Sequence, residues 1–197
     1  MRLVLDWDGT ATVRDSLVQV IHEFGDPGLL AELEPRVGID LTLHEEIAFE
    51  FAAITAPLEE VVAWVVEHVE LRPGLRELTR FAPIVSSAGF HELIEPVLAR
   101  EGVALEVRAN RVDARPEGWR VRFRDEAHCS TCGEPCKRAG VAGTPYAYVG
   151  DGYSDRCAAL AADRIFARDS LATYLGGLGV AFEPFDDLED VAAGLAR

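Results

Sequence analysis

The chain has 197 residues, of which 49% are hydrophobic and 27% charged, a composition typical of a folded globular protein rather than a disordered one. Its 34 acidic residues outnumber its 19 lysines and arginines, so the formal net charge is -15. This charge excludes nucleic acids and anionic membranes as expected partners, because both are bound by basic patches. We expect a cytoplasmic protein, since no stretch has membrane-spanning length and the N-terminus lacks the layout of a signal peptide.

The first ten residues combine a short apolar run with a cluster of acids. Residues 3–5 are predicted as a strand, and Asp6-Trp7-Asp8-Gly9-Thr10 ends it. The unbroken apolar run favours a central parallel strand, and ligands bind at the carboxyl end of such strands. Asp6 and Asp8 would face one pocket, where crowded carboxylates need a cation or a shared proton. A strand followed by an Asp-Gly turn is the alternative interpretation.

The segment after this strand changes to helical periodicity. Asp15 or Ser16 is placed to cap a first helix, and Thr42 with Glu45 three residues later forms the pattern of a capping box. Helices are expected at 15–24, 29–33, 42–54 and 58–68. Residues 14–71 are therefore predicted to be an all-helical insertion, called the helical insertion below.

Strands and helices alternate along the rest of the chain. Strands are expected at 83–87, 103–107, 147–149, 165–167 and 180–182, with helices at 73–81, 91–100, from about 137, at 154–161, from 170 and at 188–195. Residues 111–123 are predicted to form a β-hairpin around Pro116-Glu117-Gly118. This alternation predicts an α/β fold with a doubly wound, mostly parallel sheet, built from residues 1–13 and 72–197.

Four polar clusters lie at predicted strand ends or helix starts, which neighbouring parallel strands bring to one edge of the sheet. They are Asp6 with Asp8, Ser87, Lys137, and Asp151 with Asp155. Several carboxylates around one point require a hard cation, and oxygen ligands suit Mg²⁺. A cation, a lysine, a hydroxyl and helix N–H groups together bind phosphate, and a remaining aspartate can attack phosphorus.

These clusters, in this order, resemble the four motifs of the haloacid-dehalogenase-like (HAD) phosphatases. The position of the helical insertion resembles the subclass that includes the phosphoserine phosphatases. His128-Cys129, Cys132 and Cys136-Lys137, together with residues 149–155 and 162–169, are most similar to phosphatases of methionine salvage, which act on an enediol phosphate. The resemblance implies a Rossmann-like core, a Mg²⁺ cofactor and a small phosphorylated metabolite as the substrate. Trp7 departs from the pattern, which usually has phenylalanine there.

The resemblance also implies roles for the four aspartates. Asp6 would be the nucleophile and a Mg²⁺ ligand. Asp8 would act as general acid and then as general base, with its backbone carbonyl on the metal. Asp151 would bind the metal directly, and Asp155 would hold a metal-bound water or Lys137.

The remaining roles concern phosphate and substrate. Ser87 and Lys137 would hold the phosphoryl oxygens, and Ser86 is the alternative to Ser87. Asp15 stands where the phosphoserine enzymes carry a substrate-binding glutamate, although it can equally be a helix cap. The residues expected to contact the substrate are Thr10, Asp15, Ser86, Ser87 and Gly89.

Three of the four cysteines are clustered and leave two interpretations open. Cys129, Cys132 and Cys136 with His128 could bind Zn²⁺, but adjacent His128 and Cys129 would chelate awkwardly and a second C-x-x-C pair is missing. Reduced thiols are therefore favoured. Cys157 is expected to be a small core residue.

Two classes of function follow from these patterns. The first is a Mg²⁺-dependent phosphomonoesterase that forms an aspartyl-phosphate on a methionine-salvage enediol phosphate, phosphoserine or another small ester. The second is a non-catalytic zinc- or phosphate-binding protein whose acidic surface meets a basic partner. The sequence makes no prediction about the oligomeric state.

Overall fold

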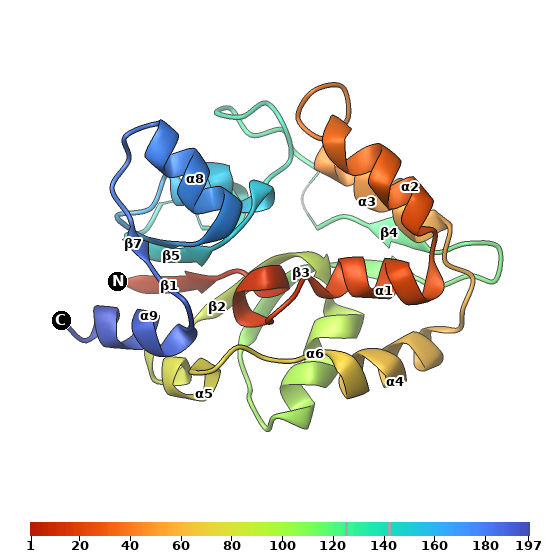
Figure 1. Ribbon diagram of the computed structural model, residues 1–197, viewed down its shortest axis with the longest axis horizontal. Coiled ribbons are helices and arrows are strands. Elements are labelled where there is room, and N and C mark those ends of the chain that lie inside the picture. Colours follow the sequence, from red (N-terminus) through yellow and green to blue (C-terminus); the bar gives the residue numbers. More distant parts are fainter. Residues whose placement is uncertain (125, 142) are drawn as a thin grey trace.

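The computed structural model describes residues 1–124, 126–141 and 143–197. Within these residues, seven strands form one sheet in the order β4-β3-β2-β1-β5-β6-β7 (Figure 1). The strands are β1 (Arg2–Leu5), β2 (Ile84–Phe90), β3 (Glu106–Asp113), β4 (Arg120–Arg122), β5 (Tyr146–Gly150), β6 (Arg164–Ala167) and β7 (Glu183–Pro184). Neighbouring strands run parallel except β3 and β4, which are antiparallel. The predicted doubly wound, mostly parallel α/β sheet is confirmed.

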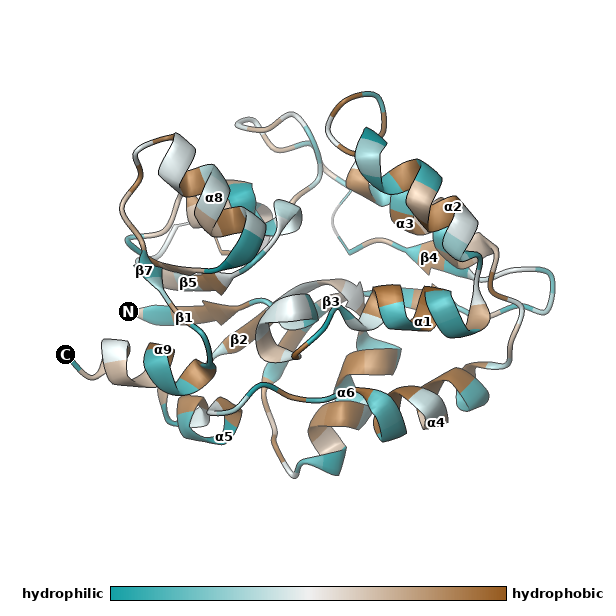
Figure 2. Cartoon of the chain, in the orientation of Figure 1, coloured by the Kyte–Doolittle hydropathy of each residue, from teal (hydrophilic) through white to brown (hydrophobic). Residues whose placement is uncertain are grey.

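Strand β1 is buried on both faces, as its apolar run predicts. Leu3 and Leu5 join the apolar core on one side of the sheet, while Val4 joins the core on the other side. Helices α5 (Leu75–Leu78), α6 (His91–Arg100) and α9 (Leu188–Leu195) contribute to the first core, and α7 (Arg156–Ala159) and α8 (Asp169–Gly177) to the second. Figure 2 shows the hydrophobic colouring of β1, β5 and α6.

The helical insertion contains α1 (Ser16–Phe24), α2 (Pro27–Leu33), α3 (Leu43–Ala52) and α4 (Leu58–His68). The chain leaves and re-enters the sheet domain side by side, since Thr12 pairs with Leu71 in an antiparallel bridge. Asp15 caps α1, and Thr42 with Glu45 forms the expected capping box at α3. Figure 1 shows that α4 runs beside α6, whereas α2 and α3 stand away from it above the β3–β4 hairpin.

The hairpin supports the helical insertion through one buried tryptophan. The Trp119 ring packs against Phe51 of α3 with the ring centroids 6.3 Å apart. Its indole Nε1–H donates to the Ala56 carbonyl oxygen over 2.9 Å, which satisfies the polar end of a buried aromatic side chain. The hairpin therefore holds α3 and the segment that joins α3 to α4.

Two predictions about the central strands are wrong in their boundaries. Strand β2 continues through residues 88–90, beyond its expected end at residue 87, because Phe90 is fully buried and pairs with Asn110 of β3. The strand expected at 103–107 and the first arm of the hairpin are one continuous strand, β3. The polar side chain of Asn110 interrupts the apolar pattern there, but it donates to the Ala88 carbonyl oxygen within the sheet.

Three later predictions differ in length or position. The helix expected from about 137 is a single 3-10 turn, Lys137–Gly140, and the helix expected at 154–161 begins with the 3-10 turn Tyr153–Asp155 and ends with α7 at Ala159. The first of these segments ends at Gly140 and Gly143 follows it, and glycine is a poor helix former. The strand expected at 180–182 lies at β7 instead, where Glu183 pairs with β6. No helix among the described residues is long and apolar enough to traverse a lipid bilayer.

Candidate active site

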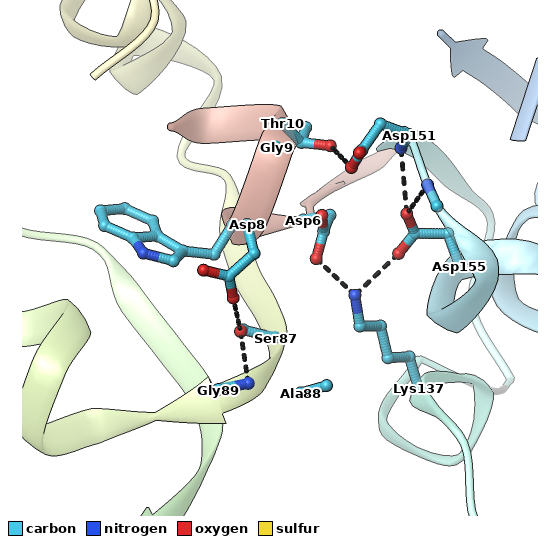
Figure 3. A network of polar contacts seen from close by, with 12 residues as sticks. Asp6, Asp8, Gly9, Thr10, Ser87, Ala88, Gly89, Lys137, Asp151 and Asp155 are labelled. Atoms are coloured by element: carbon cyan, nitrogen blue, oxygen red, sulfur yellow. Dashed lines mark hydrogen bonds and ion pairs between the residues drawn. The ribbon is translucent and has the colours of Figure 1, made fainter. Parts of the chain in front are cut away.

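The polar clusters predicted from the sequence meet at the carboxyl ends of the central strands (Figure 3). Asp6 follows β1, and its backbone N–H donates to the Val149 carbonyl of β5 over 2.9 Å. Ser87 lies in β2, Asp151 follows β5, and Lys137 comes from the 3-10 turn beside them. The parallel order β2-β1-β5 therefore places residues from both ends of the chain around one point.

Lys137 is the only lysine in the chain and lies buried between two aspartates. Its ammonium group donates to Asp6 Oδ1 and, over 2.7 Å, to Asp155 Oδ1. Burial alone would lower the pKa of Lys137, but the charges of Asp155 and Asp6 raise it above its ordinary value. Burial and the charge of Asp155 raise the pKa of Asp6 well above its ordinary value. The lysine is therefore charged and offsets the charge of this cluster.

Asp155 fixes the acidic loop through both of its carboxylate oxygens. Oδ1 accepts the Tyr148 hydroxyl over 2.7 Å, and Oδ2 accepts the backbone N–H groups of Asp151 and Gly152, each over 3.0 Å. The Thr10 hydroxyl donates to Asp151 Oδ1 over 2.6 Å. Burial and the charge of Asp155 raise the pKa of Asp151 to about 6. Asp155 thus positions the lysine and the loop together.

The carboxylates provide a donor set that fits Mg²⁺. One oxygen from each of Asp6, Asp151 and Asp155 lies within 4.8 Å of the others. Hard oxygen donors at this spacing suit Mg²⁺, which binds through one or two carboxylates and keeps several waters. Gly9 has a φ of 74°, and a side chain there would collide with the Asp151 carboxylate. The glycine therefore allows the turn after β1 to pass beside this cluster.

The Asp8 carboxylate points away from the metal-binding oxygens. Its Oδ1 accepts the Ser16 backbone N–H over 3.1 Å and the Ser16 hydroxyl, and its Oδ2 accepts the Ser87 hydroxyl over 3.2 Å. Burial raises the pKa of Asp8, while the hydrogen bonds from Ser16 and the charge of Lys137 act in the opposite direction. A raised pKa favours the protonated carboxyl group that a general acid needs.

The structure distinguishes the two neighbouring serines of β2. The Ser87 hydroxyl also accepts the Gly89 backbone N–H over 2.8 Å, so it is held at the mouth of the site next to Asp8. The Ser86 hydroxyl is fully buried and has no hydrogen-bond partner among the described residues. The alternation of side chains along β2 thus directs Ser87, and not Ser86, into the site.

A cavity of about 620 Å³ extends from these residues to the helical insertion. Asp6, Asp8, Lys137 and Asp151 line its floor. The insertion contributes acids and apolar side chains, namely Asp15, Leu17, Ile21, Leu30, Glu34, Glu46, Ile47 and Glu50. Asp15 accepts the Val18 backbone N–H over 2.9 Å, so it caps α1 and borders the cavity at once.

Glu46 and Glu50 of the insertion are buried, and among the described residues neither forms an ion pair with a cation. Asp15 also lines the cavity but keeps an exposed surface. Desolvation by the surrounding protein atoms, followed by the charge of Asp8, raises the pKa of Asp15 to about 7. Burial and the charge of Glu34 raise the pKa of Glu46 to about 7. Burial, followed by the charge of Glu46, raises the pKa of Glu50 to about 8. This wall of the cavity therefore presents carboxyl groups that are partly protonated near neutral pH.

Three residues that support the site were not predicted from the sequence. Ser16 holds Asp8, and Tyr148 holds Asp155. The buried guanidinium of Arg72 donates to the carbonyl oxygens of Gly9 over 2.7 Å and Thr10 over 2.8 Å, which fixes the turn after β1. Arg72 stands where the chain re-enters the sheet domain, and this position was the only signal that could have identified it.

A doubly wound sheet whose carboxyl edge gathers aspartates, a serine and a buried lysine defines an α/β enzyme built to handle phosphate. Comparison with known proteins supports this class of enzyme. The chain belongs to the haloacid dehalogenase-like hydrolase family, which it matches over residues 3–160. This match confirms the family resemblance predicted from the four motifs.

The chain is also similar to individual curated proteins and solved structures. A 2-hydroxy-3-keto-5-methylthiopentenyl-1-phosphate phosphatase of Bacillus cereus is 24% identical over 99% of this chain and 95% of its own length. A phosphoserine phosphatase from T. onnurineus has a TM-score of 0.68 at 19% identity, covering 98% of this chain and 92% of that one. A substrate-bound phosphoserine phosphatase has a TM-score of 0.72 at 15% identity, covering 96% of both chains. These comparisons bear out the predicted enzyme class, a phosphoric monoester hydrolase.

Proposed function

We propose that the chain hydrolyses a small phosphate monoester through an aspartyl-phosphate on Asp6. The observation that carries this proposal is the arrangement around Asp6: Lys137 holds one of its carboxylate oxygens, and Asp8 lies on the same turn with a raised pKa. Preorganised charges of this kind stabilise a transferring phosphoryl group without reorganisation.

The carboxyl groups of Asp6 and Asp8 would perform different steps of the reaction. A carboxylate oxygen of Asp6 attacks phosphorus, so an O–P bond forms as the ester P–O bond breaks, and the Asp8 carboxyl donates its proton to the departing alcohol oxygen. In the second half, Asp8 takes a proton from a water that attacks the phosphorus, which releases phosphate and restores Asp6. Ser16 keeps the Asp8 carboxyl in place for both proton transfers.

The phosphoryl oxygens would be bound by Lys137 on the floor of the cavity and by Ser87, which lines the adjoining pocket. Lys137 and the Ser87 hydroxyl would contact these oxygens, and Gly89 supplies the N–H that orients Ser87. Asp6 and Asp151, with the Asp8 backbone carbonyl, would hold Mg²⁺, and Asp155 would hold Lys137 beside it. The cation supplies positive charge that offsets the phosphate oxygens and the carboxylates.

We further propose that the helical insertion is a cap that encloses the substrate. It provides the wall of the cavity opposite Asp6 and is tied to the sheet domain by the paired segments at Thr12 and Leu71. Closing such a cap excludes water and commits the substrate to transfer within the enzyme.

The lining favours the methionine-salvage ester over phosphoserine as the substrate. Among the described residues that line the cavity, the cations are Lys137 and Arg156, while the insertion presents Asp15, Glu46 and Glu50. These acids could pair with the ammonium group of phosphoserine but would repel its carboxylate, for which Arg156 is the cation of the lining besides Lys137. A hydroxy-keto methylthiopentenyl phosphate instead has no charge beyond its phosphate, and a protonated Glu50 can donate to its oxygens.

The test compares phosphate release from the enediol phosphate and from phosphoserine, with Mg²⁺ and with a chelator. We expect Mg²⁺-dependent turnover, at least tenfold faster for the enediol phosphate, and a loss of roughly 10³-fold or more in Asp6→Asn because the nucleophile is gone. Asp186→Asn, at an exposed position outside the cavity, serves as the matched control and keeps full activity.

Each outcome has a distinct meaning. Turnover that survives Asp6→Asn would overturn the aspartyl-phosphate mechanism. A preference for phosphoserine would leave the mechanism and reassign the substrate. No turnover on any phosphate ester tested would favour the non-catalytic binding protein instead.

A further inference from the structure

The four cysteines form a second cluster beside the active site. Cys129, Cys132 and Cys136 lie in the segment after β4, and Cys157 lies on α7. Their four Sγ atoms all lie within 4.8 Å of one another. The sequence pattern placed Cys157 in the core, apart from the other three, but the fold brings it into their group.

The spacing of the sulfurs fits a tetrahedral metal site rather than disulfides. The four cysteines are free, and Cys129 Sγ lies 3.8 Å from Cys157 Sγ, too far for an S–S bond. Four thiolates around Zn²⁺ at a Zn–S distance of about 2.3 Å stand about 3.8 Å apart in a tetrahedron. The separation of this pair therefore equals the edge of a tetrathiolate zinc site.

The backbone around Cys129 is folded as a tight turn that presents its sulfur. The Thr131 N–H donates to Cys129 Sγ over 3.4 Å, and the Gly133 N–H donates to the Cys129 carbonyl oxygen over 2.8 Å. His128, the alternative fourth ligand, is not a member of this group among the described residues. Its Nδ1 lies 2.6 Å from the Gly133 carbonyl oxygen. Cys157 takes the fourth position, which removes the need for two adjacent residues to chelate together.

We propose that Cys129, Cys132, Cys136 and Cys157 bind one structural Zn²⁺ that ties the segment 129–136 to α7. The soft thiolates suit Zn²⁺, whereas the hard oxygens of the aspartate cluster suit Mg²⁺, so the two clusters select different metals. This proposal does not depend on the proposed function, because metal content is measured without turnover.

The position of the site gives the zinc a structural consequence. Cys136 directly precedes Lys137, and Cys157 follows Asp155 by two residues. The zinc would thus hold together the two segments that supply the buried Lys137–Asp155 ion pair. A closed four-ligand site stabilises the fold but offers no open position for catalysis.

The experiment is elemental analysis of the full chain, purified under reducing conditions without added metal. We expect about one zinc per chain in the wild type, and at least a fivefold reduction in Cys157→Ser, since a structural site needs all four ligands. His128→Ala is the matched control and retains its zinc. In the wild type, Co²⁺ replacing zinc should give the absorption bands of a tetrahedral thiolate complex.

Zinc absent from the wild type, iron in its place, or a disulfide among these cysteines would overturn the proposal. So would zinc that is unchanged in Cys157→Ser or lost in His128→Ala. If Cys157→Ser does not fold, hydrogen exchange of the wild type before and after zinc removal tests the zinc site instead. Faster exchange at 129–138 with unchanged exchange in the helical insertion supports the site, and equal exchange throughout contradicts it.

Discussion

The floor of the cavity and the wall that the insertion provides differ in how their buried carboxyl groups are hydrogen-bonded. On the floor, Lys137 pairs with Asp155, a fully buried residue behind the lining that accepts four hydrogen bonds. On the insertion, Glu50 is buried, and its Oε1 has no hydrogen-bond partner among the described residues. A satisfied network fixes geometry before the substrate arrives, whereas an unsatisfied buried carboxyl group costs stability and is available to a ligand. We therefore expect the floor to provide the chemistry and the insertion to provide the selectivity.

The most damaging change to the floor is the loss of Lys137. Lys137→Met removes the charge that offsets Asp6 and Asp155, and we expect kcat to fall by roughly 10²- to 10³-fold. Lys137→Arg keeps the charge, but a planar guanidinium does not fit the position of a compact ammonium group that is 5% exposed. We therefore expect a similar loss, measured as initial rates of phosphate release at saturating substrate.

The control for this pair is Arg76→Lys, which exchanges the same two residue types at an exposed position. It should leave kcat unchanged. Full activity in Lys137→Arg would mean that the charge alone matters, and that the fixed geometry of the floor does not.

The two adjacent serines of β2 test whether the direction of the side chain, and not the residue type alone, determines activity. Ser87→Ala removes the hydroxyl that contacts Asp8 and Gly89, and we expect roughly a 10- to 100-fold loss of kcat/KM. Ser86→Ala removes a buried hydroxyl without a partner, so activity should be unchanged and stability equal or slightly higher. Steady-state kinetics and thermal melting of both variants test this, and equal losses in both would refute the assignment of Ser87.

The floor of the cavity could be predicted from the sequence because its residues follow local rules. Asp6 and Asp151 end apolar runs, and the parallel sheet then brings such ends together. The fold class follows from the same alternation of strands and helices. The capping boundaries of the helical insertion were equally local, since Asp15 and Thr42 form hydrogen bonds with residues three positions away.

What could not be predicted depends on contacts between distant segments. Arg72 reaches the turn after β1, and Cys157 reaches the cysteines some twenty or more residues before it, only because of how α7 and the re-entering chain pack. The continuous strand β3 was missed because Asn110 breaks its apolar pattern but bonds to Ala88 across the sheet. Tertiary context overrides local pattern at such positions.

The smallest predicted effect concerns the insertion wall and the pH dependence of its stability. Burial, followed by the charge of Glu46, raises the pKa of Glu50 from 4.5 to about 8. The folded state then keeps a proton that the unfolded state releases, so stability falls as the pH rises from about 4.5 to about 8. Glu50→Gln cannot ionise and should remove this contribution, which makes the variant more stable than the wild type at pH 8 but not at pH 4.

Urea unfolding at pH 4, 6 and 8 measures this difference directly. We expect the gap in unfolding free energy between Glu50→Gln and the wild type to widen with pH, by about 1 kcal/mol, a typical effect of one buried polar group. Glu60→Gln, at an exposed position of α4, should show no such trend. A gap that stays constant with pH would mean that Glu50 ionises in the folded protein as it does in the unfolded chain, and the insertion wall would then be as well satisfied as the floor.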